Sequence, residues 1–213
     1  MLFLAMKTLF ISCFLVHLVV TASLAKQGNP SQDEKDIAEI LISAVQKLEE
    51  RDGPGGFGLK FIPQEKIPFS GWHKQYWDNG RVRFLKQYKQ GKKDGLYHYW
   101  SRNGMKSQEI NYQKDKAHGL WTSWYANGQK QLEQTLNSGK LDGPARRWYE
   151  NGKIKDECIY KDGRIISIVV WKPNGERCLL TNLVEGNGLW VRYKQDGSED
   201  WRSNYRDGFY VLD

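Results

Sequence analysis

Few residues of this chain could do acid–base or metal chemistry, and their spacing does not bring them together. Beyond residue 25 the histidines are His73, His98 and His118, and each stands at a different distance from the nearest turn signal. A catalytic base or nucleophile needs further groups within reach that orient and activate it. We therefore predict that these histidines are surface or turn residues, that the chain has no catalytic residues, and that it is not an enzyme.

Three glutamates recur at a regular spacing and could form a ladder of carboxylates that binds cations: Glu109, Glu133 and Glu157. Opposite charges that face each other across neighbouring strands also form pairs, and Lys and Arg are spread along the chain next to the acidic residues. Pairing with Lys or Arg is therefore the favoured interpretation. Cys and His show no zinc-ligand spacing, so we expect no metal and no cofactor.

Two cysteines lie beyond residue 25, Cys158 and Cys178. Within the repeat described next they occupy even and odd positions, which point to opposite faces of a sheet. An intervening strand would also separate them by ~9–10 Å, beyond the usual limit of ~7 Å between the Cα atoms of a disulfide. We therefore expect two free thiols.

The most regular feature of the chain is a set of glycines at near-constant spacing: Gly80, Gly104, Gly128, Gly152, Gly175 and Gly197. An aromatic residue stands four positions before each: Tyr76, Trp100, Trp124, Trp148, Trp171 and Tyr193. A second row stands eight positions after each: Tyr88, Tyr112, Leu136, Tyr160, Leu183 and Tyr205. A unit of about 24 residues is therefore repeated six times from Phe69 to the C-terminus, which indicates a repeat architecture.

Each unit is predicted to be a β-hairpin. Asn-Gly or Asp-Gly between two strand-like runs is typical of a type I′ turn, in which both central residues have a positive φ. This turn places the residue eight after the glycine opposite the residue nine before it. That residue is a glycine in five units, which an aromatic ring on the facing strand could cover. A three-residue loop with a bulge is the alternative and would shift the pairing by one residue.

The predicted fold class is therefore mainly β. We expect an elongated, open antiparallel β-meander of about six hairpins, or about twelve strands, preceded by one amphipathic helix. The aromatic row before the turns shares one face of this sheet and is a candidate binding face: Trp100, Trp124, Trp148, Trp171 and Tyr193. Because a single-layer sheet has no second sheet to bury these rings, neighbouring rings and the stems of Lys and Arg are expected to cover them.

The first 68 residues differ from the repeats. Lys7, the apolar run from Leu9 to Val20 and the small residues before Lys26 have the layout of a secretory signal peptide that is cleaved near Ala25. Apolar residues at helical spacing predict one amphipathic helix over residues 31–50 that covers an end or a face of the sheet. The glycine-rich stretch 51–56 is interpreted as a linker.

The predicted organisation is a signal peptide (1–25), a helix with a Gly/Pro-rich linker (26–68) and a repeat domain (69–213). The protein is expected to be secreted or periplasmic, with no transmembrane segment in the mature chain. Its net charge is +7, but Lys and Arg are scattered among Glu and Asp. This pattern is typical of solvated faces and disfavours nucleic acid or lipid headgroups as the partner.

Units such as Gly-Leu-Trp-Thr-Ser-Trp-Tyr-Ala-Asn-Gly-Gln at 119–129 and Tyr-Lys-Asp-Gly at 160–163 resemble the MORN-repeat variant of bacteria. The resemblance implies an open, twisted β-meander that binds a ligand without catalysis. Members of this family are sometimes labelled antitoxin components. The fifth and sixth units depart from the pattern, with shorter spacing and Ile166 in place of a glycine, so they could be irregular or act as a terminal cap.

The favoured function is an exported, non-catalytic scaffold that binds another protein, or itself, through a sheet face or an exposed edge. One alternative is binding of a cell-envelope glycan or an anionic polymer through the periodic aromatic and basic faces. A second alternative, implied by the resemblance, is an antitoxin-like component.

Overall fold

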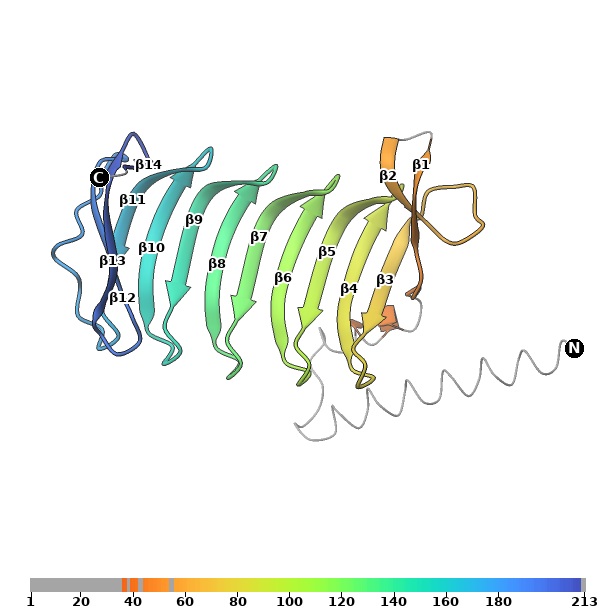
Figure 1. The fold of residues 1–213 in the computed structure, drawn as a ribbon, viewed down its shortest axis with the longest axis horizontal. Coiled ribbons are helices and arrows are strands. Elements are labelled where there is room, and N and C mark those ends of the chain that lie inside the picture. The colour runs from red at the N-terminus through yellow and green to blue at the C-terminus, as the bar shows by residue number, and fades with distance from the viewer. Residues whose placement is uncertain (1–35, 38, 42–43, 54–55, 212–213) are drawn as a thin grey trace, which may run out of the picture.

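The main body of the protein is a nine-stranded antiparallel meander. The computed structural model describes residues 36–37, 39–41, 44–53 and 56–211. Each strand pairs with its neighbour in the sequence from β3 to β11, and the sheet is one layer thick (Figure 1). The strands are β3 (Gly71–Tyr76), β4 (Val82–Lys89), β5 (Lys92–Trp100), β6 (Lys106–Gln113), β7 (Lys116–Trp124), β8 (Lys130–Asn137), β9 (Lys140–Trp148), β10 (Ile154–Lys161) and β11 (Arg164–Val170). The mainly β, elongated meander is thus confirmed.

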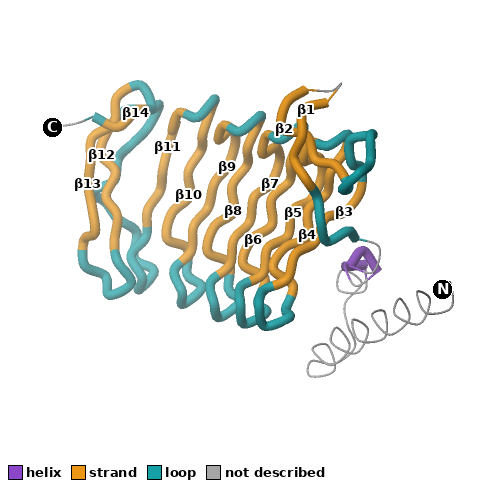
Figure 2. The backbone as a smooth tube through the Cα atoms, turned by 45° about the vertical axis from the view of Figure 1, so that its right-hand side comes forward, coloured by secondary structure: helices purple, strands orange, loops and turns teal. Residues whose placement is uncertain are grey.

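Two smaller sheets stand at the ends of this meander (Figure 2). At the N-terminal end, β1 (Glu49–Gly53) pairs with β2 (Gly56–Phe61). At the C-terminal end, β12 (Gly188–Tyr193), β13 (Glu199–Arg206) and β14 (Phe209–Tyr210) form a three-stranded sheet. Twelve strands in one meander are therefore not observed. In the fifth unit the second strand is reduced to one bridge between Trp171 and Arg177, so the sixth hairpin forms a separate sheet.

The turns at Asn-Gly are not type I′. In the β7–β8 hairpin the Gly128 amide donates to the Tyr125 carbonyl (3.0 Å), and the Tyr125 amide donates to the Gln129 carbonyl (2.8 Å). Gly128 has a φ of +83°, whereas Asn127 has no positive φ. The turn is therefore a three-residue loop. A bulge next to Trp124 cancels the resulting shift, so that Gly119 still pairs with Leu136 as predicted.

Asparagine recurs in these loops because its side chain joins adjacent units. The Asn127 side-chain carbonyl accepts from the Gln129 amide (3.0 Å), and its NH₂ group donates to the Glu150 carbonyl of the next unit (2.9 Å). The two-residue turns with two positive φ values lie at the opposite ends of the strands, as in Ser138 (+51°) and Gly139 (+88°). Each unit thus uses a different turn at each end of its strands.

The glycines opposite the tyrosine row are required for a different reason than the predicted cover by an aromatic ring. Gly95 pairs with Tyr112 as expected. Its φ is +106°, and a Cβ atom there would displace the flexible Gln87 side chain of the preceding strand. Glycine is favoured there because the backbone is left-handed.

Both edges of the nine-stranded sheet are hydrogen-bonded to other segments of the chain. On β3, the Val45 amide donates to the Trp72 carbonyl (2.8 Å), and on β11 the Cys178 amide donates to the Val170 carbonyl (2.8 Å). The expectation of free edges is therefore wrong at these positions, because the chain's own flanking segments occupy them.

Two buried clusters attach the flanking segments to the two faces of the sheet. Residues of β9 to β11 pack against the C-terminal sheet and the segment before it, which confirms that the degenerate units form a cap: Ala145, Cys158, Ile165, Ile168, Val170, Cys178, Leu183, Trp190, Val191 and Tyr193. On the other face a small cluster of Leu41, Ala44 and Leu85 also holds Ile37, Ile40, Trp72, Val82 and Trp100.

The predicted amphipathic helix is not confirmed at its predicted length. Residues 36–37 and 39–41 are helical, and the Ala44 amide still donates to the Ile40 carbonyl (3.0 Å). Val45 then bridges to His73, and β1 begins at Glu49, because pairing with other strands outweighs the local helical pattern. The expected linker contributes Gly53 and Gly56 to a hairpin. The predicted signal peptide lies outside the described residues.

Candidate interaction surfaces

The nine-stranded sheet has two chemically different faces, set by the alternation of side chains along each strand. On β5, Leu96, His98 and Trp100 point to one side, which we call the tryptophan face, and Tyr97 and Tyr99 point to the other, which we call the tyrosine face. The pairing of neighbouring strands carries this division across the sheet.

On the tryptophan face, cationic side chains lie over the tryptophan rings. The Lys106 Nζ atom is 5.2 Å from the ring centroid of Trp124, and the Lys130 Nζ atom is 5.7 Å from that of Trp148. Arg146 also lies over Trp148, at 5.9 Å. The predicted cover by Lys and Arg is thus confirmed for Trp124 and Trp148, and it gives these two rings a structural role.

The glutamates lie between the tryptophans and each pairs with a Lys or Arg, but only Glu157 does so across strands, as predicted. Glu109 pairs with Lys106, Glu133 with Lys130 (2.6 Å) and Glu157 with Arg146. Hydrogen bonding from His98, with a further contribution from Lys106, lowers the pKa of Glu109 to about 2 against the opposing effect of burial. Each carboxylate therefore balances a lysine or arginine, and the row is close to neutral.

The candidate binding face divides in the structure. Trp100, Trp124 and Trp148 end β5, β7 and β9 on the same face, and Trp171 follows directly after β11. Tyr193 belongs instead to the separate C-terminal sheet, where it is buried with its hydroxyl 3.2 Å from the Cys178 sulfur. The tyrosine row divides in the same way, with Tyr88, Tyr112 and Tyr160 on the tyrosine face and Tyr205 on β13.

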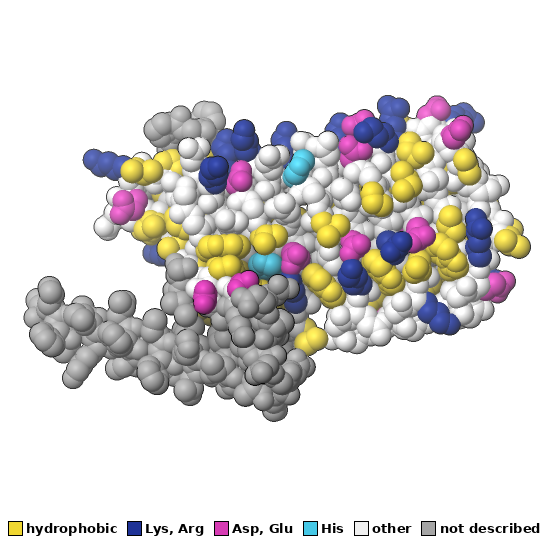
Figure 3. Space-filling model, turned by 180° about the vertical axis from the view of Figure 1, so that it is seen from behind, with side chains coloured by type: hydrophobic (Ala, Val, Ile, Leu, Met, Phe, Trp, Pro, Cys, Tyr) yellow, Lys and Arg dark blue, Asp and Glu magenta, His cyan; other side chains and the backbone are white. Residues whose placement is uncertain are grey.

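A row of exposed aliphatic residues crosses the tryptophan face on the other side of the glutamates. Leu96 is 40% exposed, Leu120 is 51% exposed and Ile159 is 46% exposed. Figure 3 shows this side of the molecule, with hydrophobic side chains in bands across the strands and charged side chains between them. The aliphatic row continues the line of Trp72, which the helical segment covers.

Two of the three histidines, His73 and His98, are more buried than predicted. His73 is buried between Phe84 and Tyr88 with its Nε2 atom 3.3 Å from the Gln46 carbonyl, and desolvation lowers its pKa. His98 is buried between the rings of Trp72 and Trp100. They are packing residues because strand alternation directs them onto the crowded aromatic rows. Among the described residues, no group of three or more His, Cys, Asp or Glu side chains could hold a metal ion.

The tyrosine face holds a cluster of aromatic rings with lysines on them. Phe84 and Tyr97 meet edge to face at 6.2 Å, and Tyr97 lies 6.3 Å from Tyr112. The Lys86 Nζ atom is 4.0 Å from the ring centroid of Phe84 and 4.7 Å from that of Tyr97. The Lys93 Nζ atom is 4.5 Å from that of Tyr112.

Sequence reasoning missed these two lysines. Lys86 lies six residues after its turn glycine, where the following units carry Ile110, Gln134 and Cys158. The sequence did contain a signal for Lys86, because the equivalent position in the following units is uncharged. Lys93 pairs with Tyr88 in the β4–β5 register, which places both lysines on the same face of adjacent strands.

Closer to the cap, the tyrosine face carries an ion pair whose carboxylate is buried. The Arg147 Nε atom donates to the Asp156 Oδ1 atom (2.7 Å), and the guanidinium lies 5.1 Å from the Trp190 ring of the cap. Cys158 and Cys178 lie in this region as free thiols, as predicted. The argument from opposite faces was wrong, because Cys178 follows β11 and joins the same buried cluster as Cys158.

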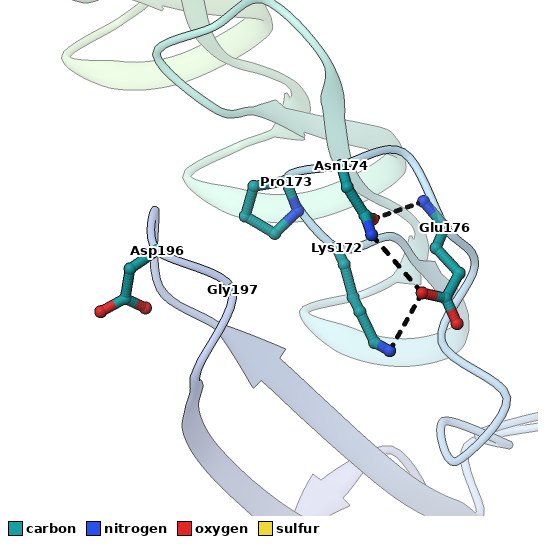
Figure 4. A pocket seen from close by; sticks show the side chains of 6 residues that line it. All are labelled: Lys172, Pro173, Asn174, Glu176, Asp196 and Gly197. Carbon is teal, nitrogen blue, oxygen red and sulfur yellow. Dashed lines mark hydrogen bonds and ion pairs between the residues drawn. The ribbon is translucent and has the colours of Figure 1, made fainter.

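A cleft between two turns near the C-terminus offers little chemistry. It is lined by Lys172, Pro173, Asn174, Glu176, Asp196 and Gly197 (Figure 4). Its carboxylates are already engaged, since Glu176 pairs with Lys172 (3.3 Å) and Asp196 accepts hydrogen bonds from the Ser198 amide (2.8 Å) and hydroxyl (2.6 Å). In the part of the chain that the structure describes, no helix is long and apolar enough to cross a membrane.

The repeat pattern has a counterpart among known families. The MORN repeat variant matches residues 117–137 and 141–162, which correspond to β7–β8 and β9–β10 with their turns. Within these two stretches the chain matches the repeat that the sequence pattern resembles. A comparison with the curated proteins found no match.

Two solved structures are similar to part of the chain. One is titled as the crystal structure of TarM (9% identity, TM-score 0.29, 70% of this chain and 27% of that chain). The other is an S. aureus TarM mutant in complex with Fondaparinux, alpha-GlcNAc-glycerol and UDP (10% identity, TM-score 0.30, 71% of this chain and 27% of that chain). The chain thus spans 27% of the length of these proteins, and at such TM-scores the likeness says nothing about function.

Proposed function

We propose that the chain is an exported, non-catalytic scaffold that binds a partner protein on the open part of its tryptophan face. The observation that carries this proposal is the row of exposed aliphatic side chains at Leu96, Leu120 and Ile159. Exposed apolar rows beside polar ones are typical of surfaces that a partner covers. Export is supported by the signal-like N-terminal sequence.

The helical segment of the chain itself indicates which kind of partner fits. Ile37, Ile40 and Leu41 pack on the N-terminal end of this face, against Trp72 and Trp100 among others. In the next units Leu96 and Leu120 stand where Trp72 stands, and Trp124 and Trp148 stand where Trp100 stands. The open surface therefore repeats the two rows that already hold a short helix, and an amphipathic helix of a partner is the occupant we propose.

The two parts of the face differ at one position in each unit. Leu85 lies beneath the helical segment, and Glu109, Glu133 and Glu157 replace it in the following units. The partner helix should therefore carry polar groups along its centre and apolar groups on both sides of them. Because the sheet edges at β3 and β11 are used within the chain, a face is the better candidate than β-strand addition.

The two other candidate functions are less well supported on this face. Stacking of a sugar on Trp124 or Trp148 would compete with the lysines that lie over those rings. An antitoxin-like role would itself require a protein partner, so it is a special case of the proposed interaction.

Site-specific photo-crosslinking in the source cells tests the proposal. A photoreactive benzoylphenylalanine replaces Leu120 in one variant and the exposed Lys140, at the start of β9, in the control. We expect the Leu120 variant to form an adduct with one partner, mapped by mass spectrometry to an amphipathic helix. Adding Leu96→Asp should remove this adduct, because a buried, unpaired charge opposes docking.

Three results would contradict the proposal. They are equal adducts from both positions, no adduct from either, and an adduct that maps outside a helix. An adduct between two copies of the chain would replace a separate partner by self-association.

A further inference from the structure

The tyrosine face presents cationic groups that no described carboxylate pairs with. Lys106 and Lys130 of the tryptophan face each pair with a glutamate, whereas the structure records no ion pair between Lys86 or Lys93 and any described carboxylate. Lys86 lies over Phe84 and Tyr97, and Lys93 lies over Tyr112. Lys86 and Lys93 thus differ from Lys106 and Lys130 in having no anionic partner among the described residues.

The neighbourhood of Lys86 is itself positive. Burial, followed by the positive charges of Lys93, Arg83 and Lys60, lowers the pKa of Lys86 to about 8. Among these neighbours Lys60 is paired with Glu50, and Arg83 lies over the Trp77 ring at 4.6 Å. A half-buried ammonium group surrounded by cations would be stabilised by an anion from outside the chain.

Polar groups without a recorded partner lie beside the lysines. In the described part of the chain, the hydroxyls of Tyr97 and Tyr112 have no recorded hydrogen bond, although each ring lies beside a lysine. Further along the face the buried Trp121 Nε1 atom has no hydrogen-bond partner among the described residues. Gln108 and Gln134 add amide groups there, since they face Tyr99 and Trp121 across the strands. Cationic groups and hydrogen-bonding groups therefore follow one another along the tyrosine face, from β4 towards β8.

We propose that Lys86 and Lys93, framed by Phe84, Tyr97 and Tyr112, bind the oxyanion groups of an acidic polysaccharide. The lysines contact its sulfate or carboxylate groups, and the tyrosine hydroxyls and the amides beyond them contact its sugar hydroxyls. Because the face lies open between the β1–β2 hairpin and the C-terminal cap, a linear polymer can lie along it (Figure 2).

The chemistry of the face favours a polysaccharide over other anions. A nucleobase needs an open aromatic face for stacking, but lysines and the edges of neighbouring rings occupy the faces of Phe84 and Tyr97. A lipid needs an apolar surface for its acyl chains. The exposed large apolar side chains of β3–β11 are Leu96, Leu120 and Ile159, and these lie on the tryptophan face.

The test compares two double variants of the full chain with the same change in net charge. Lys86→Gln with Lys93→Gln removes the proposed site, and Lys106→Gln with Lys130→Gln removes two ring-stacked lysines from the tryptophan face. Binding is measured by isothermal titration calorimetry with dextran sulfate, polygalacturonate and neutral dextran, at physiological ionic strength. Thermal melts followed by circular dichroism check that each variant is folded.

We expect the unmodified chain to bind at least one acidic polymer and not dextran. The site variant should lose about tenfold or more in affinity, whereas the control variant should stay within about twofold. Binding of dextran sulfate alone would identify sulfate esters, binding of polygalacturonate alone would identify uronic carboxylates, and either supports the proposal. If the site variant does not fold, Tyr97→Phe with Tyr112→Phe provides the test, and it should weaken binding about two- to fivefold.

Equal losses in the two lysine variants would overturn the proposal, because they would show attraction to net charge alone. Failure of the unmodified chain to bind either acidic polymer would also overturn it. Tighter binding of single-stranded DNA or of anionic phospholipid vesicles than of both polymers would reject a polysaccharide as the ligand.

Discussion

The two faces of the nine-stranded sheet both carry lysines over aromatic rings, but they differ in whether a carboxylate pairs with these lysines. Both place lysines over aromatic rings, as Lys130 over Trp148 and Lys86 over Phe84 show. On the tryptophan face each lysine of the row also has a glutamate, for example Glu133 at 2.6 Å from Lys130. On the open part of the tyrosine face that counter-charge is not recorded among the described residues, and the pKa of Lys86 is lowered.

The difference shows that a periodic aromatic row does not by itself mark a binding site. Rings that are covered by paired cations are satisfied within the fold, as at Trp124 and Trp148. Where a cation on an aromatic ring has no paired carboxylate, an anionic ligand can still interact favourably with it. We therefore assign the periodic tryptophans a structural role, and we consider Lys86 and Lys93, which do not follow the repeat, the stronger candidates for binding a ligand.

The largest expected effect concerns the ion pair of Asp156 and Arg147 beside the cap. Asp156 is 1% exposed and pairs with Arg147, whereas the adjacent Glu157, on the other face, is 36% exposed and pairs with Arg146. Asp156→Ala should lower the free energy of unfolding by about 3 kcal/mol, because it leaves the guanidinium of Arg147, which is 29% exposed, without its buried partner. Glu157→Ala is the matched control and should cost about 0–1 kcal/mol. Urea unfolding measures both, and similar losses would contradict the assigned burial.

The second prediction concerns Lys86, whose replacement should increase the stability of the fold and weaken the binding of an acidic polysaccharide. Because the pKa of Lys86 in the folded chain is about 8, below its ordinary value of 10.5, the unfolded chain binds more protons between these values. The unfavourable contribution of Lys86 is therefore full below pH 8 and is relieved as the pH rises towards 10.5.

Lys86→Met should accordingly raise the free energy of unfolding at pH 7 by about 1–2 kcal/mol, and this gain should shrink above pH 8. The same variant should bind an acidic polysaccharide less tightly. Thermal melts across this pH range, paired with calorimetry, make the comparison. A variant that is destabilised at pH 7 would argue against an unneutralised lysine on the tyrosine face.

The smallest effect concerns the paired row on the tryptophan face. The pKa of Glu109 in the folded chain is about 2, below its ordinary value of 4.5, so its contribution to stability is present above pH 4.5 and is lost as the pH falls towards 2. Glu109→Gln should therefore lower the free energy of unfolding at pH 7 by about 1 kcal/mol, since the side chain is partly exposed. Acid titration of both proteins by NMR and thermal melts should show the difference vanish near pH 2; a constant difference would reject the pairing.

Regular, local features of the fold were predictable from the sequence, and features that depend on distant segments were not. The pairing of Gly119 with Leu136 followed from the spacing of the repeat. The turn type did not follow, because a longer loop and a bulge compensate each other and leave the same register. Within the candidate sites, the cover of Trp124 by Lys106 was predictable from the need to shield an exposed ring, but the isolated lysine pair was not.

The sequence by itself determined the repeat, the register of its hairpins and the separation of its two faces, because these depend on spacing within one unit and on the alternation of side chains along a strand. Only the tertiary structure decided where the meander stops, how its edges are covered and which cations keep an unneutralised charge. These features arise when segments far apart in the chain meet, as Val45 does with Trp72 and Cys178 with Val170, and such contacts have no periodic signature in the sequence.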